Sequence, residues 1–164
     1  MMPLNLIPTA FLIDYASFGD SLWLLATSYI DKLVKENHEI FRHDMPRYEI
    51  KSCNGCGSCY SKEVACSYLD DFNKIPPEIL FSDEVYLFGE GPLSSAFHNA
   101  LSKFEVFPHS SKKTHVQKFV FVYIGKLSND DEKLVNKAAE MLSCKLSLLQ
   151  FKDVDEAKAF LDIQ

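Results

Sequence analysis

Five short apolar runs, separated by amphipathic stretches of helical period, constrain the fold of this chain more than any other feature. We expect strands at residues 9–14, 39–42, 84–88, 118–124 and 145–151. The run at 118–124, KFVFVYI, is β-branched or aromatic almost throughout, which is typical of a strand buried on both faces. Buried strands that alternate with helices indicate a parallel sheet covered on both sides.

Helices are predicted between these strands, at residues 21–35, 94–104, 129–142 and 154–161, and Asp20 or Ser21 can cap the first of them. A further helical stretch begins at Asp70 and is interrupted by the Pro76-Pro77 pair. Five strands favour the flavodoxin-like strand order 2-1-3-4-5 over the six-stranded dinucleotide fold. We therefore expect one doubly wound α/β domain over residues 1–164, with a cysteine-rich loop at residues 50–68.

This topology also locates any ligand. Doubly wound sheets bind ligands beyond the carboxyl ends of their strands, at the point where the strand order reverses. The loops after the first, third and fourth strands, at residues 15–20, 89–95 and 125–129, should therefore converge there. The cysteine-rich loop follows the second strand, so it should lie at the same end of the sheet.

The charge balance argues against one class of partner. The chain has 17 basic and 23 acidic side chains and a net charge of −6, whereas nucleic-acid phosphates are bound by basic surfaces. No apolar run reaches the ~18 residues of a membrane span, and the first residues lack the basic start of a secretory signal. We therefore expect a cytoplasmic protein that binds neither nucleic acid nor membranes.

Four of the five cysteines are concentrated in one glycine-rich segment. Cys53, Cys56 and Cys59 follow one another at two-residue spacings, and Cys66 comes after six more residues. A buried structural cysteine behaves as a small apolar side chain and needs no such spacing. In the reducing cytoplasm, clustered thiols indicate a metal or redox role rather than a disulfide framework.

Three chemistries suit these four thiols. An iron–sulfur cluster takes one thiolate per iron, so closely spaced cysteines wrapping one [4Fe–4S] cluster are natural. A structural zinc also accepts four thiolates, although zinc sites usually pair two separate Cys-x-x-Cys turns. A thiol–disulfide switch needs only two thiols. We rank the cluster first, a loop that keeps its cysteines without a ligand second, and zinc and the switch behind them.

The segment around these cysteines resembles the NADPH-dependent FMN reductase family, and in particular its iron–sulfur flavoprotein branch. The resemblance rests on the run CNGCGSC at residues 53–59, on Cys66, and on the Asp70-Asp71 pair that opens a helix. Residues 82–89, SDEVYLFG, are similar to the family's segment entering the third strand. The resemblance implies a flavodoxin-like fold and a homo-oligomer. It also implies electron transfer from NAD(P)H or ferredoxin through FMN to a small-molecule or protein acceptor.

The resemblance also implies where the cofactors would be held. The flavin phosphate would lie at a helix N-terminus, which attracts anions, against Ser17, Gly19 and Ser21. The flavin ring would lie beside Gly89, Glu90, Gly91, Pro92 and Leu93. The ligands of a [4Fe–4S] cluster that relays electrons to FMN would be Cys53, Cys56, Cys59 and Cys66.

Two features depart from the family's pattern. The arginine of the family's first loop is absent, and Asp14 and Asp20 bring negative charge, which repels a phosphate. The aromatic residue expected after the third strand is replaced by Leu93. These departures support a competing hypothesis, in which the chain has no flavin and uses its cysteine loop as a zinc or thiol module for binding a partner or sensing oxidants.

Two other features have simple structural explanations. His98 lies on the helix predicted after the third strand, where we expect a solvated histidine rather than a proton donor. The locally basic stretch at residues 103–118 is expected to be a solvated connection rather than a docking site for an anionic partner.

Overall fold

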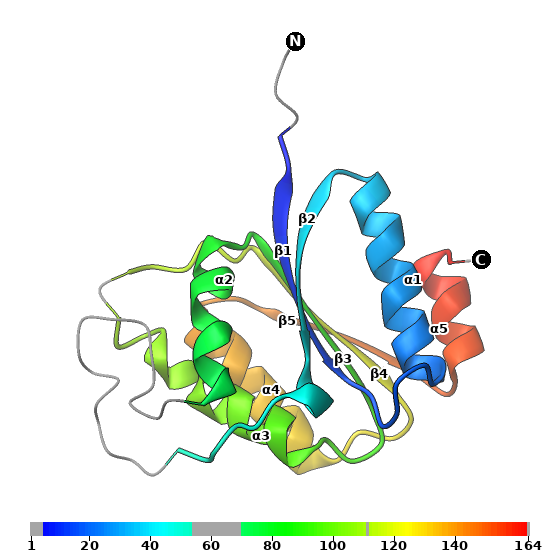
Figure 1. Cartoon of the computed structure of the whole chain (residues 1–164). Helices are drawn as coiled ribbons and strands as arrows, with labels where there is room; N and C mark the ends of the chain where they lie inside the picture. The colour runs from blue at the N-terminus through cyan, green and yellow to red at the C-terminus, as the bar shows by residue number, and fades with distance from the viewer. Residues whose placement is uncertain (1–4, 54–69, 111, 164) are drawn as a thin grey trace.

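The computed structural model describes residues 5–53, 70–110 and 112–163 (Figure 1). The strands are β1 (Ile7–Asp14), β2 (His38–Asp44), β3 (Glu84–Glu90), β4 (Lys118–Ile124) and β5 (Leu146–Phe151). The helices are α1 (Ser21–Lys35), α2 (Pro76–Phe81), α3 (Ser95–Ser102), α4 (Asn129–Met141) and α5 (Val154–Leu161). Three short 3₁₀ turns complete the described elements: η1 (Met45–Arg47), η3 (Asp71–Lys74) and η4 (Lys103–Val106).

The strands form one parallel sheet in the order β2-β1-β3-β4-β5, which confirms the predicted flavodoxin-like α/β fold. Helices α1 and α5 cover one face, and α2, α3 and α4 cover the other (Figure 1). Successive strand side chains point to opposite faces, so Phe11 and Phe88 pack toward α1 and α5 while Leu87 and Phe121 pack toward α3 and α4. Among the described residues, no helix combines the length and apolarity needed to cross a bilayer.

The start of α2 and the end of α3 differ from the predicted positions, and a proline and buried side chains explain the differences. Pro76 occupies the first turn of α2 and so begins a helix, because the N–H that proline lacks is not needed there. The helix predicted to run to residue 104 ends at Ser102 and continues as the 3₁₀ turn η4. The side chains of Phe104 and Val106 in this turn are buried in the core beside α3.

The register of the sheet places three loop starts side by side. Asp14 at the end of β1 pairs with Gly89 of β3, which pairs in turn with Tyr123 of β4. The chain leaves β1 toward β2 through α1, then returns to β3 on the other side of β1. The reversal of strand order therefore falls between β1 and β3, at the carboxyl edge of the sheet.

Candidate functional site

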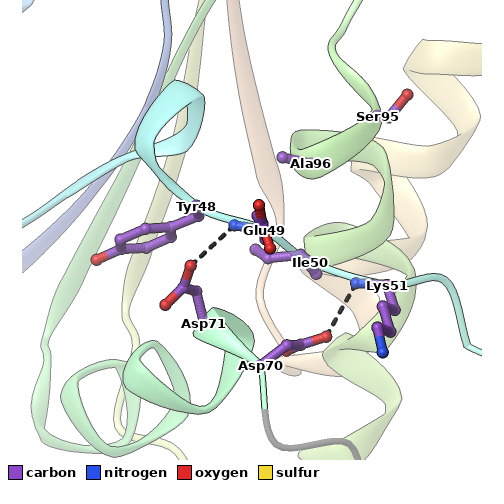
Figure 2. Close-up of a pocket in the computed structure, with 8 residues that line it drawn as sticks. All are labelled: Tyr48, Glu49, Ile50, Lys51, Asp70, Asp71, Ser95 and Ala96. Carbon is purple, nitrogen blue, oxygen red and sulfur yellow. Dashed lines mark hydrogen bonds between the residues drawn. The ribbon is translucent and has the colours of Figure 1, made fainter.

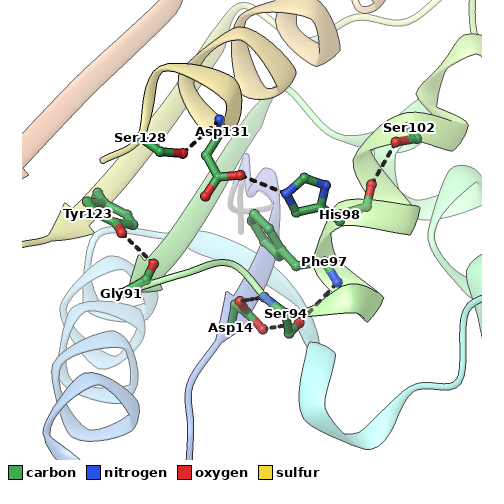
Figure 3. A network of polar contacts seen from close by, with 9 residues as sticks. All are labelled: Asp14, Gly91, Ser94, Phe97, His98, Ser102, Tyr123, Ser128 and Asp131. Carbon is green, nitrogen blue, oxygen red and sulfur yellow. Dashed lines mark hydrogen bonds and ion pairs between the residues drawn. The ribbon is translucent and has the colours of Figure 1, made fainter. Parts of the chain in front are cut away.

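A buried carboxylate joins two of the converging loops. Asp14, at the end of β1, accepts hydrogen bonds from the Ser94 backbone N–H at 2.8 Å and from the Ser94 hydroxyl at 2.6 Å (Figure 3). Ser94 is also the N-cap of α3, since its hydroxyl oxygen accepts the N–H of Phe97. The predicted convergence of the loops after β1 and β3 is therefore confirmed, and Asp14 holds them together. Burial raises the pKa of Asp14 even though both bonds from Ser94 favour its charged form.

The raised pKa of Asp14 has a measurable consequence. In the folded protein Asp14 holds its proton to a higher pH than in the unfolded chain, so its contribution to stability falls as pH rises from about 4 through the folded pKa. The stability advantage of the wild type over Asp14→Asn should therefore shrink as pH rises through this window. Denaturant unfolding of both proteins between pH 3 and 7 measures the difference in their free energies of unfolding. The contributions of the other titrating groups are common to both proteins and cancel in this difference. An advantage that grows with pH would contradict a raised pKa.

A second carboxylate occupies the loop between β1 and α1. Asp20 is the N-cap of α1, as predicted, and its Oδ1 accepts the N–H of Trp23 at 2.8 Å. Its Oδ2 turns back into the loop and accepts the N–H groups of Ala16 at 3.1 Å and Ser17 at 3.0 Å. The loop folds in this way because Gly19 adopts a left-handed φ of 80°. Two backbone donors of the loop and one of the first turn of α1 thus point at a side chain of the protein itself.

The loop after β3 is packed tightly against the sheet. An added Cβ on Gly89 would lie 3.1 Å from Leu93 Cδ2 and 3.3 Å from Phe121 Cε1, so this strand position has room only for glycine without adjustment. Leu93 is buried in the core, whereas Glu90 and Pro92 are exposed. The Tyr123 hydroxyl donates to the Gly91 carbonyl, which fixes the turn to β4 (Figure 3). Leu93 therefore acts as a core residue beneath this loop.

His98 is paired rather than simply solvated. Its Nε2 lies 2.7 Å from Oδ1 of Asp131, a largely buried residue in the first turn of α4 (Figure 3). The His98 side chain remains 43% exposed, in line with the solvated histidine expected from the sequence. The contact with Asp131, which the sequence did not predict, joins α3 to α4.

Two acidic residues tie the ends of the cysteine-rich segment together. The Asp71 carboxylate accepts the N–H of Glu49 at 2.8 Å, and Oδ2 of Asp70 accepts the N–H of Lys51 at 2.9 Å (Figure 2). The N–H of Asp71 returns a bond to the Glu49 carbonyl at 3.2 Å. We call these bonds between residues 49–51 and 70–71 the clasp.

The clasp is anchored on a buried ion pair. Lys103 Nζ lies 3.1 Å from Asp70 Oδ2, and the two side chains are 1% and 8% exposed. Burial alone would raise the pKa of Asp70, but the N–H groups of Lys51 and Phe72 and the Lys103 ammonium outweigh it and hold this pKa below its usual value. The expectation that residues 103–118 form a solvated connection is wrong at its start, because Lys103 is a core residue.

The side chain of Asn99 secures the clasp to α3 by donating to the Ile50 carbonyl at 2.7 Å. A cavity of about 690 Å³ lies between the clasp and the first turn of α3 and is open to solvent; its lining includes Lys51, Asp70 and Ser95 (Figure 2). Cys53 follows the clasp and is exposed, with its Sγ 3.5 Å from Glu105 Oε1. The other three predicted ligands, Cys56, Cys59 and Cys66, lie outside the described residues.

Several of these residues carried no signal in the sequence pattern. Ser94, Lys103 and Asp131 each act through a partner 33 to 80 positions away, which periodicity cannot reveal. The sequence predicts a helix start at the Asp70-Asp71 pair, and Asp70 does cap η3. The part that both residues play in the clasp depends on contacts with residues 49–51, which the sequence does not reveal.

Comparison with solved structures identifies the fold. The chain is similar to an NAD(P)H:quinone oxidoreductase from Methanothermobacter marburgensis, with a TM-score of 0.63 and 9% identity over 96% of this chain and 92% of that one. It is also similar to a flavone reductase, with a TM-score of 0.67 and 11% identity over 93% of this chain and 59% of that one. A short-chain flavodoxin matches with a TM-score of 0.52 and 8% identity over 96% and 95% of the two chains. No protein-family model and no curated protein matches the sequence. At these identities the similarity establishes a flavodoxin-like fold.

Proteins of the family that this chain resembles bind FMN. The residues of the β1–α1 loop determine whether the FMN phosphate could be held there. This phosphate would need N–H groups of the β1–α1 loop and of the first turn of α1, and three of these, those of Ala16, Ser17 and Trp23, already bond to Asp20. A phosphate that approached these donors would lie beside a carboxylate, which costs about 1 kcal/mol per pair of unit charges at 4 Å in water and more at a protein surface. As it stands, the loop does not fit the FMN phosphate.

Proposed function

We propose that this chain is a flavodoxin-fold oxidoreductase that transfers electrons at the carboxyl edge of its sheet, between a flavin ring and the cysteine-rich segment. The clasp is the observation that carries this proposal. It anchors both ends of segment 52–69 beside the first turn of α3, and α3 follows directly from the loop expected to border the ring. The fold similarity to quinone and flavone reductases supports the same class of chemistry.

In the finer form of this proposal, Cys53, Cys56, Cys59 and Cys66 hold a [4Fe–4S] cluster. Electrons would come from NAD(P)H or ferredoxin and pass to a small-molecule or protein acceptor. The flavin would be held by contacts with its ring beside residues 89–93 rather than by a phosphate in the β1–α1 loop.

A second candidate is a flavin-less protein that uses the cysteine segment as a zinc or thiol module. The occupied loop at Asp20 favours it, because this loop would otherwise be the anion site of a bound flavin. The buried position of Leu93, where the family has an aromatic residue, favours it as well.

Anaerobic purification followed by a visible spectrum and analysis of iron, zinc and extracted flavin separates these candidates. The oxidoreductase should show a flavin band near ~450 nm and, in the finer form, iron. Protein with about one zinc and neither flavin nor iron would favour the second candidate, as would metal-free protein whose thiol count falls with peroxide. Colourless protein that lacks flavin, metal and peroxide-sensitive thiols contradicts both.

A matched pair of variants tests the cysteine assignment. Cys59→Ser should lose most of the bound metal, because it removes one of four thiolate ligands. Cys144→Ser should keep the metal, since Cys144 packs against the core beside β5 and burial raises the pKa of its thiol. Equal metal content in the two variants would contradict the assignment.

A further inference from the structure

We propose that Asp20 is a built-in anion that fills the phosphate position of the β1–α1 loop and excludes phosphorylated ligands from it. Under the proposed function, the flavin would then place no phosphate at the start of α1. The identity of the ring rests on the proposed function, whereas the exclusion of phosphate rests on Asp20 alone.

The geometry of Asp20 goes beyond that of a helix cap. A capping carboxylate needs one oxygen for the N–H groups of the first turn, and Oδ1 of Asp20 takes the N–H of Trp23. Its Oδ2 reaches back to the N–H groups of Ala16 and Ser17, which precede the helix. Asp153, the N-cap of α5, bonds to the N–H of Glu156, while the N–H of Lys152 before it bonds to the Glu156 side chain. Asp20 thus gathers two donors of the loop and one of the helix onto one charged group.

The surrounding charges do not offset this carboxylate. Residues 14–21 contain no lysine or arginine. Arg42 bonds through Nε to Asp44 at 2.7 Å and through Nη1 to Thr27 at 3.0 Å, and its guanidinium lies 5.4 Å from the centre of the Trp23 ring. The guanidinium of Arg47, on the neighbouring turn η1, stacks 5.8 Å from the centre of the Phe18 ring. Within the described part of the chain neither guanidinium bonds to Asp20, so a dianion placed at the loop would still lie directly against this carboxylate, and we expect phosphate to be disfavoured there.

The test uses Asp20→Ser, because serine keeps a good N-cap for α1 while it releases the donors of the loop and removes the charge. Asp153→Ser is the matched control, since it makes the same change at the cap of α5. Amide NMR of the full chain would follow the Ala16, Ser17 and Trp23 signals during titration with inorganic phosphate, with chloride at equal ionic strength as the reference. FMN and riboflavin would be titrated in parallel by flavin fluorescence.

In the wild type and in Asp153→Ser, phosphate should shift the three amide signals no more than chloride does. FMN should bind no more tightly than riboflavin. In Asp20→Ser, phosphate should shift these signals, and the ratio of FMN to riboflavin affinity should rise by about tenfold or more. Riboflavin affinity should change little, since the substitution lies outside residues 89–93, which are proposed to border the ring.

Phosphate-dependent shifts of the three signals in the wild type would overturn the proposal. So would an Asp20→Ser variant that folds, by its amide spectrum, yet binds phosphate no better than the wild type. If riboflavin and FMN bind to none of the three proteins while the phosphate titrations behave as expected, the flavin ring assigned under the proposed function is wrong and the role of Asp20 stands.

Discussion

Lys103→Ala is expected to lower the free energy of unfolding by about 3–5 kcal/mol, because it leaves the Asp70 carboxylate buried without its cation. The loss should reach the cysteine-rich segment as well, since Asp70 also accepts the Lys51 N–H of the clasp. Denaturant unfolding measures the free energy. Hydrogen exchange at the Glu49 and Lys51 amides, which donate to Asp71 and Asp70, measures the opening of the clasp.

Lys74→Ala is the matched control for this prediction. Lys74 forms an ion pair of similar length with Asp71, at 2.9 Å, but its side chain is 63% exposed. Exposed pairs of this kind contribute about 0–1 kcal/mol. Similar losses of unfolding free energy in Lys103→Ala and Lys74→Ala would show that the contribution of the Lys103–Asp70 pair to stability does not depend on its burial.

Phe121→Ala should cost a similar amount, about 3–5 kcal/mol, because it empties a fully buried position on the interior strand β4. The Phe121 ring stacks on Phe97 of α3, with ring centres 6.2 Å apart, and lies against Gly89 near the end of β3. Thermal unfolding should show a midpoint lower by about 10 °C for a domain of this size.

Phe160→Ala makes the same chemical change on a side chain that is 64% exposed, and its expected cost is below about 1 kcal/mol. Phe160 does contact the ring of Phe151, so some loss is expected. If Phe121→Ala were no more destabilising than Phe160→Ala, the burial of Phe121 between β4 and α3 would be wrong.

The order of elements and the sheet topology were predictable because they depend on local hydrophobic period and on strand count. The run at 118–124 predicted β4 to the residue. The ends of the other strands and of α3 depend on tertiary contacts. β2, for example, was expected at residues 39–42 but extends over His38–Asp44, paired with β1.

The candidate site was predictable in position but not in detail. The convergence of the loops follows from topology, and Asp20 as a cap follows from its place before an amphipathic run. The second oxygen of Asp20, the Asp14–Ser94 bonds and the Lys103–Asp70 pair join residues that no local pattern connects. The basic stretch was misjudged at Lys103 because composition does not reveal which lysine finds a buried carboxylate.

The clasp has a consequence for ligand binding by the segment that it closes. Because residues 49–51 and 70–71 are bonded to each other and held to α3, the two ends of the cysteine-rich segment have fixed positions beside the same helix. A closed loop loses less conformational entropy when it binds a ligand than a loop with free ends does. The bonds at its base thus lower the entropic cost of any ligand that the four cysteines would bind together.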